Sequence, residues 1–206
     1  MKNFLKTLPL VGLMFSSIAL AADNNMMVRM RSITVMPSEK GTPTRVGGDV
    51  KLSDATVPEL DFTYFFNDHF AAELILASTQ HRAAANKTSL NNLDLGEVSL
   101  LPPILLAQYH HTMGKWKPYI GAGLNYTIFY NIEPGVARSV HYKNSMGYAW
   151  QVGTDYEFLP NTYINFDIKK LYVSTDVEVN TYSNGTVKAD VDINPWIVGL
   201  GLGYRF

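Results

Sequence analysis

The chain has 206 residues, with 17 Lys and Arg against 18 Asp and Glu, and it contains no Cys. The near-neutral charge argues against nucleic-acid binding through a basic surface as the main function. The lack of thiols excludes disulfides and thiolate metal sites. After the first 21 residues no apolar stretch approaches the roughly 20 residues of a membrane-spanning helix, so insertion into a membrane would require strands.

The N-terminal segment has the pattern of a secretory signal. Two lysines lie within the first six residues, an apolar run covers 8–20, and a small-x-small motif ends at Ala21. Signal peptidase accepts this arrangement. We therefore expect a cleavable signal peptide over 1–21 and a single domain over 22–206.

Four strands are expected in the first part of that domain, over 27–36, 57–66, 69–78 and 104–112. Their polar residues recur at alternate positions, as Arg29 and Arg31 do in the first. Neighbouring residues of a strand point to opposite faces. Each of these segments therefore separates an apolar face from a face that carries polar side chains.

Four more strands are expected over 118–130, 145–158, 162–173 and 196–206. The alternation is clearest in 145–158, where large apolar residues alternate with small or charged ones. In 196–206 the face opposite the large residues is mostly glycine. Small residues suit the crowded interior of a narrow barrel.

Short and long connections alternate along the chain. The short ones lie at 67–68, 113–117 and 159–161, and polar loops are expected at 38–56, 79–97, 131–144 and 175–191. Tight periplasmic turns and long external loops have this asymmetry, and the strand count is even. The prediction is an all-β fold, an eight-stranded antiparallel transmembrane β-barrel whose closure removes every unpaired edge.

Aromatic residues gather beside the short turns, where such a barrel would meet a membrane–water interface. We expect the following residues to form this rim: Phe65, Phe66, Phe70, Trp116, Tyr119, Tyr156, Phe158, Tyr204 and Phe206.

The face opposite the apolar one predicts a charged lumen. Its expected members are Arg29, Arg31, Glu59, Asp61, Glu73, Gln108, Asp155, Glu157, Asp167, Lys169 and Arg205. Both signs of charge occur, so these side chains either pair structurally across the lumen or line a polar conduction path. An eight-stranded barrel is too narrow for a wide pore in either case.

Several runs resemble the OmpW family of small outer-membrane barrels. They are Leu101-Pro102-Pro103 followed by Ala107-Gln108, residues 117–127 (KPYIGAGLNYT), Gln151-Val152-Gly153 followed by Asp155-Tyr156, Asn194-Pro195-Trp196, and the ending Gly203-Tyr204-Arg205-Phe206. The resemblance spans nearly the whole chain after the signal. It implies an eight-stranded barrel in the outer membrane of a Gram-negative bacterium, with no enzymatic activity or cofactor, that passes small hydrophobic molecules.

The resemblance also implies particular lumen residues. It places Ile75 and Lys169 at the floor of the channel, where better-known relatives have an aromatic in place of the lysine. We expect Lys169 to pair poorly with Asp167 and to find a carboxylate across the lumen, such as Glu73. Together with Gln108 and Arg29, these residues are the candidate channel lining.

Pro102 and Pro103 are the candidate lateral opening. Proline cannot donate to a β-ladder, so a proline pair at a strand start leaves the pairing incomplete and could let a solute exit sideways. The alternative is that the pair only begins a strand after a long loop.

Transport is not the only function that the sequence allows. The resemblance implies a receptor role, with a bacteriocin, phage or host factor bound at the external loops. The expected partners also include outer-membrane lipids and, through Phe206, the barrel-assembly machinery.

A lipid-modifying enzyme would need a cluster such as Ser78, His81, Asp94 and Glu97, which matches no catalytic signature. His110 and His111 are adjacent in a strand and cannot both reach one metal ion.

Overall fold

The computed structural model of the chain describes residues 25–38, 49–88, 91–135, 138–181 and 185–206. These residues form fourteen β-strands. None of them belongs to a helix long and apolar enough to cross a membrane. The signal peptide expected over 1–21 lies outside the described residues.

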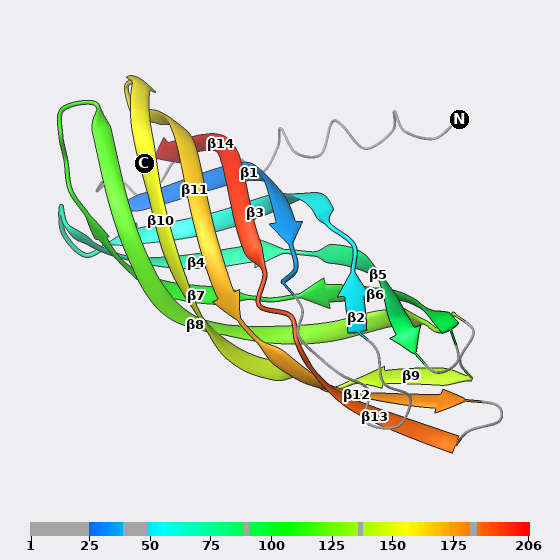
Figure 1. Cartoon of the computed structure of the whole chain (residues 1–206). Helices are drawn as coiled ribbons and strands as arrows, with labels where there is room; N and C mark the ends of the chain where they lie inside the picture. The colour runs from blue at the N-terminus through cyan, green and yellow to red at the C-terminus, as the bar shows by residue number, and fades with distance from the viewer. Residues whose placement is uncertain (1–24, 39–48, 89–90, 136–137, 182–184) are drawn as a thin grey trace, which may run out of the picture.

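Eight strands close into a barrel (Figure 1). Around the ring they are β1 (Met26–Met36), β3 (Ala55–Phe65), β4 (Phe70–Ala77), β7 (Ile104–His110), β8 (Trp116–Glu133), β10 (Ser145–Leu159), β11 (Thr162–Tyr172) and β14 (Trp196–Arg205). Every neighbouring pair is antiparallel, and β14 pairs with β1 from Met27↔Arg205 to Met36↔Trp196. The predicted fold, with its eight strands, is confirmed.

The two faces of the barrel wall differ as the alternation predicts. Along β7, Leu106, Gln108 and His110 are buried, while Leu105 and Tyr109 are exposed. The same pattern repeats around the ring, so that large apolar side chains cover the outside and most charged ones lie inside. An outward apolar surface of this kind is stable in hydrocarbon, where the closed ladder satisfies the backbone.

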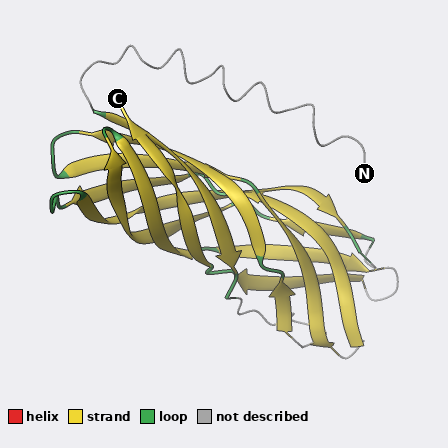
Figure 2. Ribbon diagram, turned by 90° about the horizontal axis from the view of Figure 1, so that it is seen from above, coloured by secondary structure: helices red, strands yellow, loops and turns green. Residues whose placement is uncertain are grey.

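The long connections are not the loops that the sequence suggested. They contain six further strands: β2 (Asp49–Leu52), β5 (Thr79–Thr88), β6 (Asn91–Leu101), β9 (Ser139–Tyr142), β12 (Ser174–Thr181) and β13 (Gly185–Asp192). The first three extend the barrel sheet through β8, and the other three form a separate sheet in the order β13-β12-β9. Both groups project from the end of the barrel opposite the short turns (Figures 1 and 2).

The prediction of loops was wrong because it rested on the polar composition of these segments. In β12, for example, Val177 and Val179 alternate with Asp176 and Glu178, which is a strand pattern. The two extensions share a core with the top of the barrel, made by Val98, Leu100, Phe129, Val140, Val173, Val177, Val191 and Ile193. We call these six strands the extracellular extension.

The short turns are stabilised by local hydrogen bonds and contain residues in the left-handed backbone conformation. Between β3 and β4, the Asn67 side-chain oxygen accepts hydrogen bonds from the backbone N–H groups of His69 and Phe70. Asn161, between β10 and β11, has φ 59°, a conformation that asparagine tolerates better than most residues.

The aromatic rim is present with two corrections. Phe66, Phe70, Trp116, Phe158 and Tyr204 are exposed around the short-turn end. Two predicted rim residues, Phe65 and Tyr119, are instead buried inside the barrel. Both occupy inward positions of their strands, so the alternation outweighs their nearness to a turn.

Candidate functional site

The interior of the barrel is divided along its axis into three layers. The lowest, at the short-turn end, is an apolar cluster of Met27, Phe65, Ala71 and Tyr163. The Arg205 guanidinium carbon lies 4.0 Å from the Phe65 ring centroid, within the range of a cation–π contact. This cluster occupies the lumen at the short-turn end of the barrel.

The middle layer is charged, and we call it the charged layer. It consists of Arg29, Arg31, Lys169, Glu59, Asp61, Glu73, Asp155 and Asp167, all with side chains that are at most 1% exposed. These residues come from β1, β3, β4, β10 and β11, because each of those strands places a charged residue at an inward position of the same level. Two members of the predicted lumen, Glu157 and Arg205, lie lower and are partly exposed.

Arg29 binds carboxylates from three different strands. It makes a bidentate contact with Asp155, at 3.0 Å from Nε and 2.7 Å from Nη2, and its Nη1 lies 3.0 Å from Asp61 and 3.3 Å from Glu73. A planar guanidinium suits this arrangement, since its donors have a fixed fork geometry. Arg29 therefore connects β3, β4 and β10 across the lumen.

Arg31 lies one position higher and shares two of these partners. Its Nη1 is 2.8 Å from Glu59 and 2.7 Å from Asp61, and its Nη2 is 3.0 Å from Glu73. Its Nε donates to the Asn165 side-chain oxygen at 2.6 Å. The two arginines thus hold a common set of carboxylates between them.

Lys169 closes the top of the charged layer. Its Nζ lies 2.8 Å from Glu59 and 2.5 Å from Asp167. The expectation that Lys169 would pair poorly with Asp167 and reach Glu73 is therefore wrong, because the flexible lysine stem folds back to its neighbour on the same face. Its partner across the lumen is Glu59.

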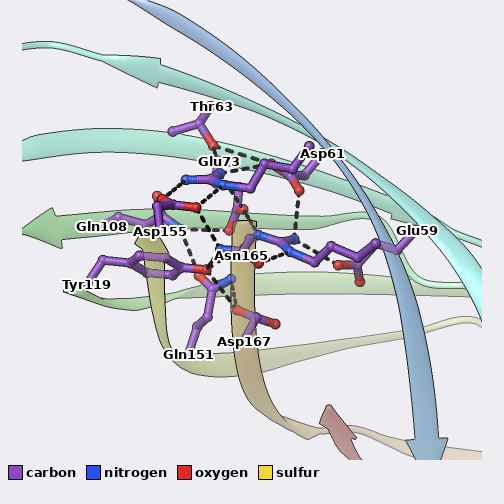
Figure 3. Close-up of polar contacts among 12 residues, drawn as sticks. Glu59, Asp61, Thr63, Glu73, Gln108, Tyr119, Gln151, Asp155, Asn165 and Asp167 are labelled. Atoms are coloured by element: carbon purple, nitrogen blue, oxygen red, sulfur yellow. Dashed lines mark hydrogen bonds and ion pairs between the residues drawn. The ribbon is translucent and has the colours of Figure 1, made fainter. Parts of the chain in front are cut away.

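Neutral side chains complete the network (Figure 3). Gln108 donates to Glu73 at 2.7 Å and to Gln151 at 2.8 Å, and Gln151 donates to Asp167 at 2.6 Å. The Tyr119 hydroxyl donates to Asp167 at 3.2 Å and accepts from Asn165 at 3.0 Å. Sequence reasoning did not include Tyr119, Asn165 or Gln151 in the lumen, although all three have the inward parity of their strands.

A buried charge is costly unless its partners replace water. In the charged layer every cation has at least two carboxylates within 3.3 Å. The long side chains extend across the whole lumen, and glycines opposite them make room. A Cβ at Gly201, for example, would lie 2.2 Å from the Met30 carbonyl oxygen and 2.8 Å from Arg31 Cγ. The charged layer fills the barrel at this level.

The upper layer is an apolar cavity of about 40 Å³, which we call the apolar chamber. This volume would hold a few water molecules. Glu59 and Ile75 are among its lining residues, as are Thr79, His81 and Thr127; the apolar lining is Ile33, Val35, Pro37, Ala77, Leu100, Pro102, Ile104, Leu171, Val173, Ile193, Pro195 and Ile197. Branched aliphatic side chains are shorter than arginine, so they leave space along the axis.

The barrel wall is interrupted beside this chamber. The β4–β7 ladder ends at Ile75↔Ile104, and the next paired residues of the two sides are Thr79↔Leu100. No register pair joins 76–78 to 101–103. Pro102 and Pro103 lie in this interval, where Pro102 lines the chamber and the Pro103 carbonyl accepts a hydrogen bond from Tyr126 N on the neighbouring β8.

A depression of about 300 Å³ lies on the outer surface at the same level. Its lining residues are Met30, Pro58, Glu59, Leu60, Leu76, Ala77, Ser78 and Leu101. Glu59 and Ala77 line both this depression and the apolar chamber. The wall between the inside and the lipid-facing side is therefore thin at these two residues.

The alternative catalytic cluster is not assembled. The Ser78 hydroxyl contacts the Tyr130 hydroxyl, His81 contacts the Ser53 carbonyl and Thr79, and Glu97 pairs with Arg82 at 2.8 Å. The side chain of Asp94 lies outside the described part of the structure. Within that part no group of three His, Asp or Glu side chains is placed to hold a metal ion. His110 is buried in the lumen, while His111 is exposed.

Comparison with known proteins places the fold in a family. The sequence model of the OmpW family matches residues 22–206. An uncharacterized outer-membrane protein, y4mB of Sinorhizobium fredii, is 39% identical over 182 residues, covering 87% of this chain and 79% of its own. Outer membrane protein W of Escherichia coli is 33% identical over 192 residues, covering 87% of each chain.

The solved structures agree. The crystal structure of the outer membrane protein OprG from Pseudomonas aeruginosa matches with a TM-score of 0.81 and 27% identity, covering 88% of this chain and 95% of that one. The closed barrel, its apolar outer surface and these relatives lead to one conclusion. The chain belongs to the OmpW family and is a β-barrel protein of the Gram-negative outer membrane.

Proposed function

We propose that the protein passes small hydrophobic molecules from the outside into the apolar chamber and then sideways through the barrel wall into the membrane. The observation that carries this proposal is the interrupted β4–β7 ladder, with the apolar chamber on its inner side and a depression on its outer side. Pro102 and Pro103 cannot donate hydrogen bonds that would close the interruption.

The straight route through the barrel is unfavourable for such a solute. Below the apolar chamber lies the charged layer, where Arg29, Arg31 and Lys169 are paired across the full width of the lumen. An apolar molecule would have to separate those pairs without replacing their interactions. In this proposal Ile75 and Glu59 form the floor from which the solute turns toward the wall, and the residues of the charged layer close the axial path.

The passage can be blocked at Ala77, which lines both sides of the thin wall. Vesicles containing the protein should take up an apolar fluorescent dye faster than protein-free vesicles. Ala77→Trp fills the passage and should abolish that acceleration. Ala72→Trp is the matched control, because Ala72 lies on the lipid-facing side of the same strand.

Replacing the proline pair tests the interruption itself. P102A/P103A restores two N–H donors where the ladder is broken, so dye uptake should fall toward the protein-free rate. Unchanged uptake in both this variant and Ala77→Trp would remove the lateral route. A steady ionic current in planar bilayers would favour a polar conduction path instead.

A receptor role is the second candidate, and the extracellular extension favours it. The β9–β12–β13 sheet and the β5–β6 hairpin stand beyond the barrel mouth, where a bacteriocin, a phage or a host factor could reach them. Normal dye uptake after removal of the β12–β13 hairpin, with loss of binding to such a partner, would separate the two functions. We further propose that Phe206 at the end of β14 is recognised by the barrel-assembly machinery.

A lipid-modifying enzyme is the least supported candidate, since Ser78 and His81 contact different partners. Hydrolysis of a phospholipid that is lost in His81→Ala would restore it.

A further inference from the structure

Lys170 stands on the lipid-facing side of β11. It follows Ile164, Phe166 and Ile168 at alternate positions, whereas Asp167 and Lys169 of the same strand point inward. Apart from the end of β8 beyond Asn131, Lys170 is the only charged residue at an outward position of the eight barrel strands, all of which the structure describes. A charge on this face needs a specific explanation.

Lys170 is enclosed by aromatic rings. It lies between Trp150 and Trp196 in the register of β10, β11 and β14, and its Nζ is 5.0 Å from the Trp196 ring centroid and 5.8 Å from that of Tyr172. The two tryptophan rings are 5.4 Å apart in an edge-on arrangement. These rings reduce the exposure of Lys170 to 8%.

This cluster lies at the height of the membrane–water boundary on the extracellular side. On β10 the outward residues Tyr148 and Phe158 are ten positions apart, which in a strand tilted by about 40° corresponds to about 25 Å along the barrel axis. This matches the apolar band of a transmembrane barrel. Phe158 is at the periplasmic rim, so Tyr148 and its stacked partner Tyr172, at 4.5 Å, mark the outer boundary.

The ammonium group of Lys170 has hydrogen-bonding capacity to spare. One N–H donates to the Asn194 carbonyl, and an ammonium has three donors. Lys169, the next residue, has two carboxylate partners, whereas Lys170 makes no ion pair with a carboxylate of the described residues. The described part of the chain therefore supplies no carboxylate that neutralises this ammonium group.

We propose that Lys170, together with Trp150, Tyr172 and Trp196, binds the phosphate group of a lipid in the outer leaflet. The lysine supplies the positive charge at headgroup height, and the flanking rings contact the upper part of the acyl chains, as amphipathic aromatics do at this boundary. The alternative is a lysine that only reaches the Asn194 carbonyl and has no preference among lipids.

Trp150 and Trp196 report on the site directly. In a Trp116→Phe background, the remaining two tryptophans are those beside Lys170. The full-length protein is placed in vesicles of phosphatidylcholine containing phosphatidic acid with brominated chains, which quench tryptophan on contact. The same measurement with brominated phosphatidylcholine gives the reference.

We expect about fivefold enrichment of phosphatidic acid over phosphatidylcholine beside these tryptophans, the effect of one lysine near a membrane surface. Lys170→Met should reduce the enrichment to about onefold, and Lys170→Arg should retain it. Lys115→Met is the matched control, because Lys115 is exposed in the short turn at the opposite end of the barrel, and it should change nothing.

Three outcomes overturn the proposal. One is enrichment that survives in Lys170→Met while the barrel is folded, as judged by its heat-dependent migration in gels. It would show that Lys170 of the unmodified protein makes only its carbonyl contact and does not select the lipid. Enrichment that millimolar inorganic phosphate abolishes would assign the site to a soluble anion instead of a lipid. Loss in Lys115→Met equal to that in Lys170→Met would point to overall surface charge and would equally refute a local site.

Discussion

Below Ile75 the barrel interior is crossed by long charged side chains, and above it the same cylinder is lined by short aliphatic ones. The backbone is continuous between the two regions, so the difference lies in the inward residues alone. Arg29 and Arg31 reach carboxylates on other strands, while Ile33 and Val35, the next inward residues of β1, end at the wall of the apolar chamber. A narrow barrel can therefore be sealed or hollow at a given level, depending on side-chain length.

The two regions should also respond differently to mutation. The charged layer is a connected network in which the loss of one member leaves several others unpaired. The apolar chamber already contains space, so a small truncation there changes little. Three predictions test this contrast, and a fourth concerns a pair of carboxyl groups outside the barrel.

The largest effect is expected for Arg29→Met. Removing this guanidinium leaves Asp155 without a cation and takes one partner from Asp61 and Glu73. Breaking a buried ion pair from one side costs about 3–5 kcal/mol, measured here as the free energy of unfolding by urea in lipid vesicles. Met30→Leu, at the lipid-facing position beside it, is the control, and a similar cost for both variants would contradict the prediction.

Gly201→Ala should have the next largest effect. The added Cβ would lie 2.2 Å from the Met30 carbonyl oxygen and 2.7 Å from Arg31 Cα, both backbone atoms. Overpacking of this kind costs about 1–3 kcal/mol. Gly121→Ala should be milder, because its nearest contacts are the side chains of Gln151 at 3.1 Å and Gln108 at 3.2 Å. Equal unfolding free energies for the two variants would show that the charged layer is not closely packed against the glycines.

In the apolar chamber, Ile104→Val should lower the free energy of unfolding by only about 1 kcal/mol. Ile104 is buried and lines the cavity, so the change removes one methylene group from a region with space already present. The same variant should raise the rate of dye uptake into vesicles, since it widens the chamber beside the interrupted ladder. A slower rate would count against the chamber as the solute path.

The smallest effect concerns charges that lie in water. Asp176 and Asp190 face each other across β12 and β13. The hydrogen bond between the two carboxyl groups lowers the pKa of Asp176 and, with their mutual repulsion, raises that of Asp190. The stabilisation from protonated Asp190 is present at acidic pH and is lost as the pH rises through its raised pKa. That from ionised Asp176 is lost as the pH falls through its lowered pKa.

An NMR titration of the carboxyl carbons would measure both groups. Asp190 should titrate above its ordinary value of 3.8 and Asp176 below it. Asp176→Asn should return Asp190 toward 3.8, because the neighbouring negative charge is gone. Two unperturbed titrations in the unmodified protein would show that the carboxyl groups do not meet.

The barrel strands could be predicted from the sequence because lipid and lumen impose opposite demands on alternate residues. Segment 145–158 carries this pattern along its whole length, and the structure has a strand over Ser145–Leu159. In the extracellular extension, by contrast, the sequence 79–88 (TQHRAAANKT) has no large apolar residues at alternate positions although it forms β5. Tyr119 was assigned to the rim because it is aromatic and lies near a turn. Its position in the alternation of the strand would by itself have placed it inside the barrel.

The partners within the charged layer could not be read from the sequence in the same way. Alternation predicts that the Lys169 side chain points into the lumen, but it does not predict the height along the barrel axis at which that side chain meets the other strands. Its partner Glu59 is 110 positions away in the chain, and their meeting depends on the stagger of the strands around the closed ring. The same stagger determines which residues border the interrupted ladder, so alternation alone could not place Ala77 beside it.

The seam between β1 and β14 has a consequence for how the molecule is made. Met27 pairs with Arg205, so β1, the first barrel strand in the chain, can pair with β14 only after that last strand has been synthesised. Until then β3 is its only neighbour. Joining segments so distant in the chain carries a large entropic cost and makes folding slow. Until that moment β1 has an open edge, and an exported intermediate with such an edge must be kept from pairing with other chains.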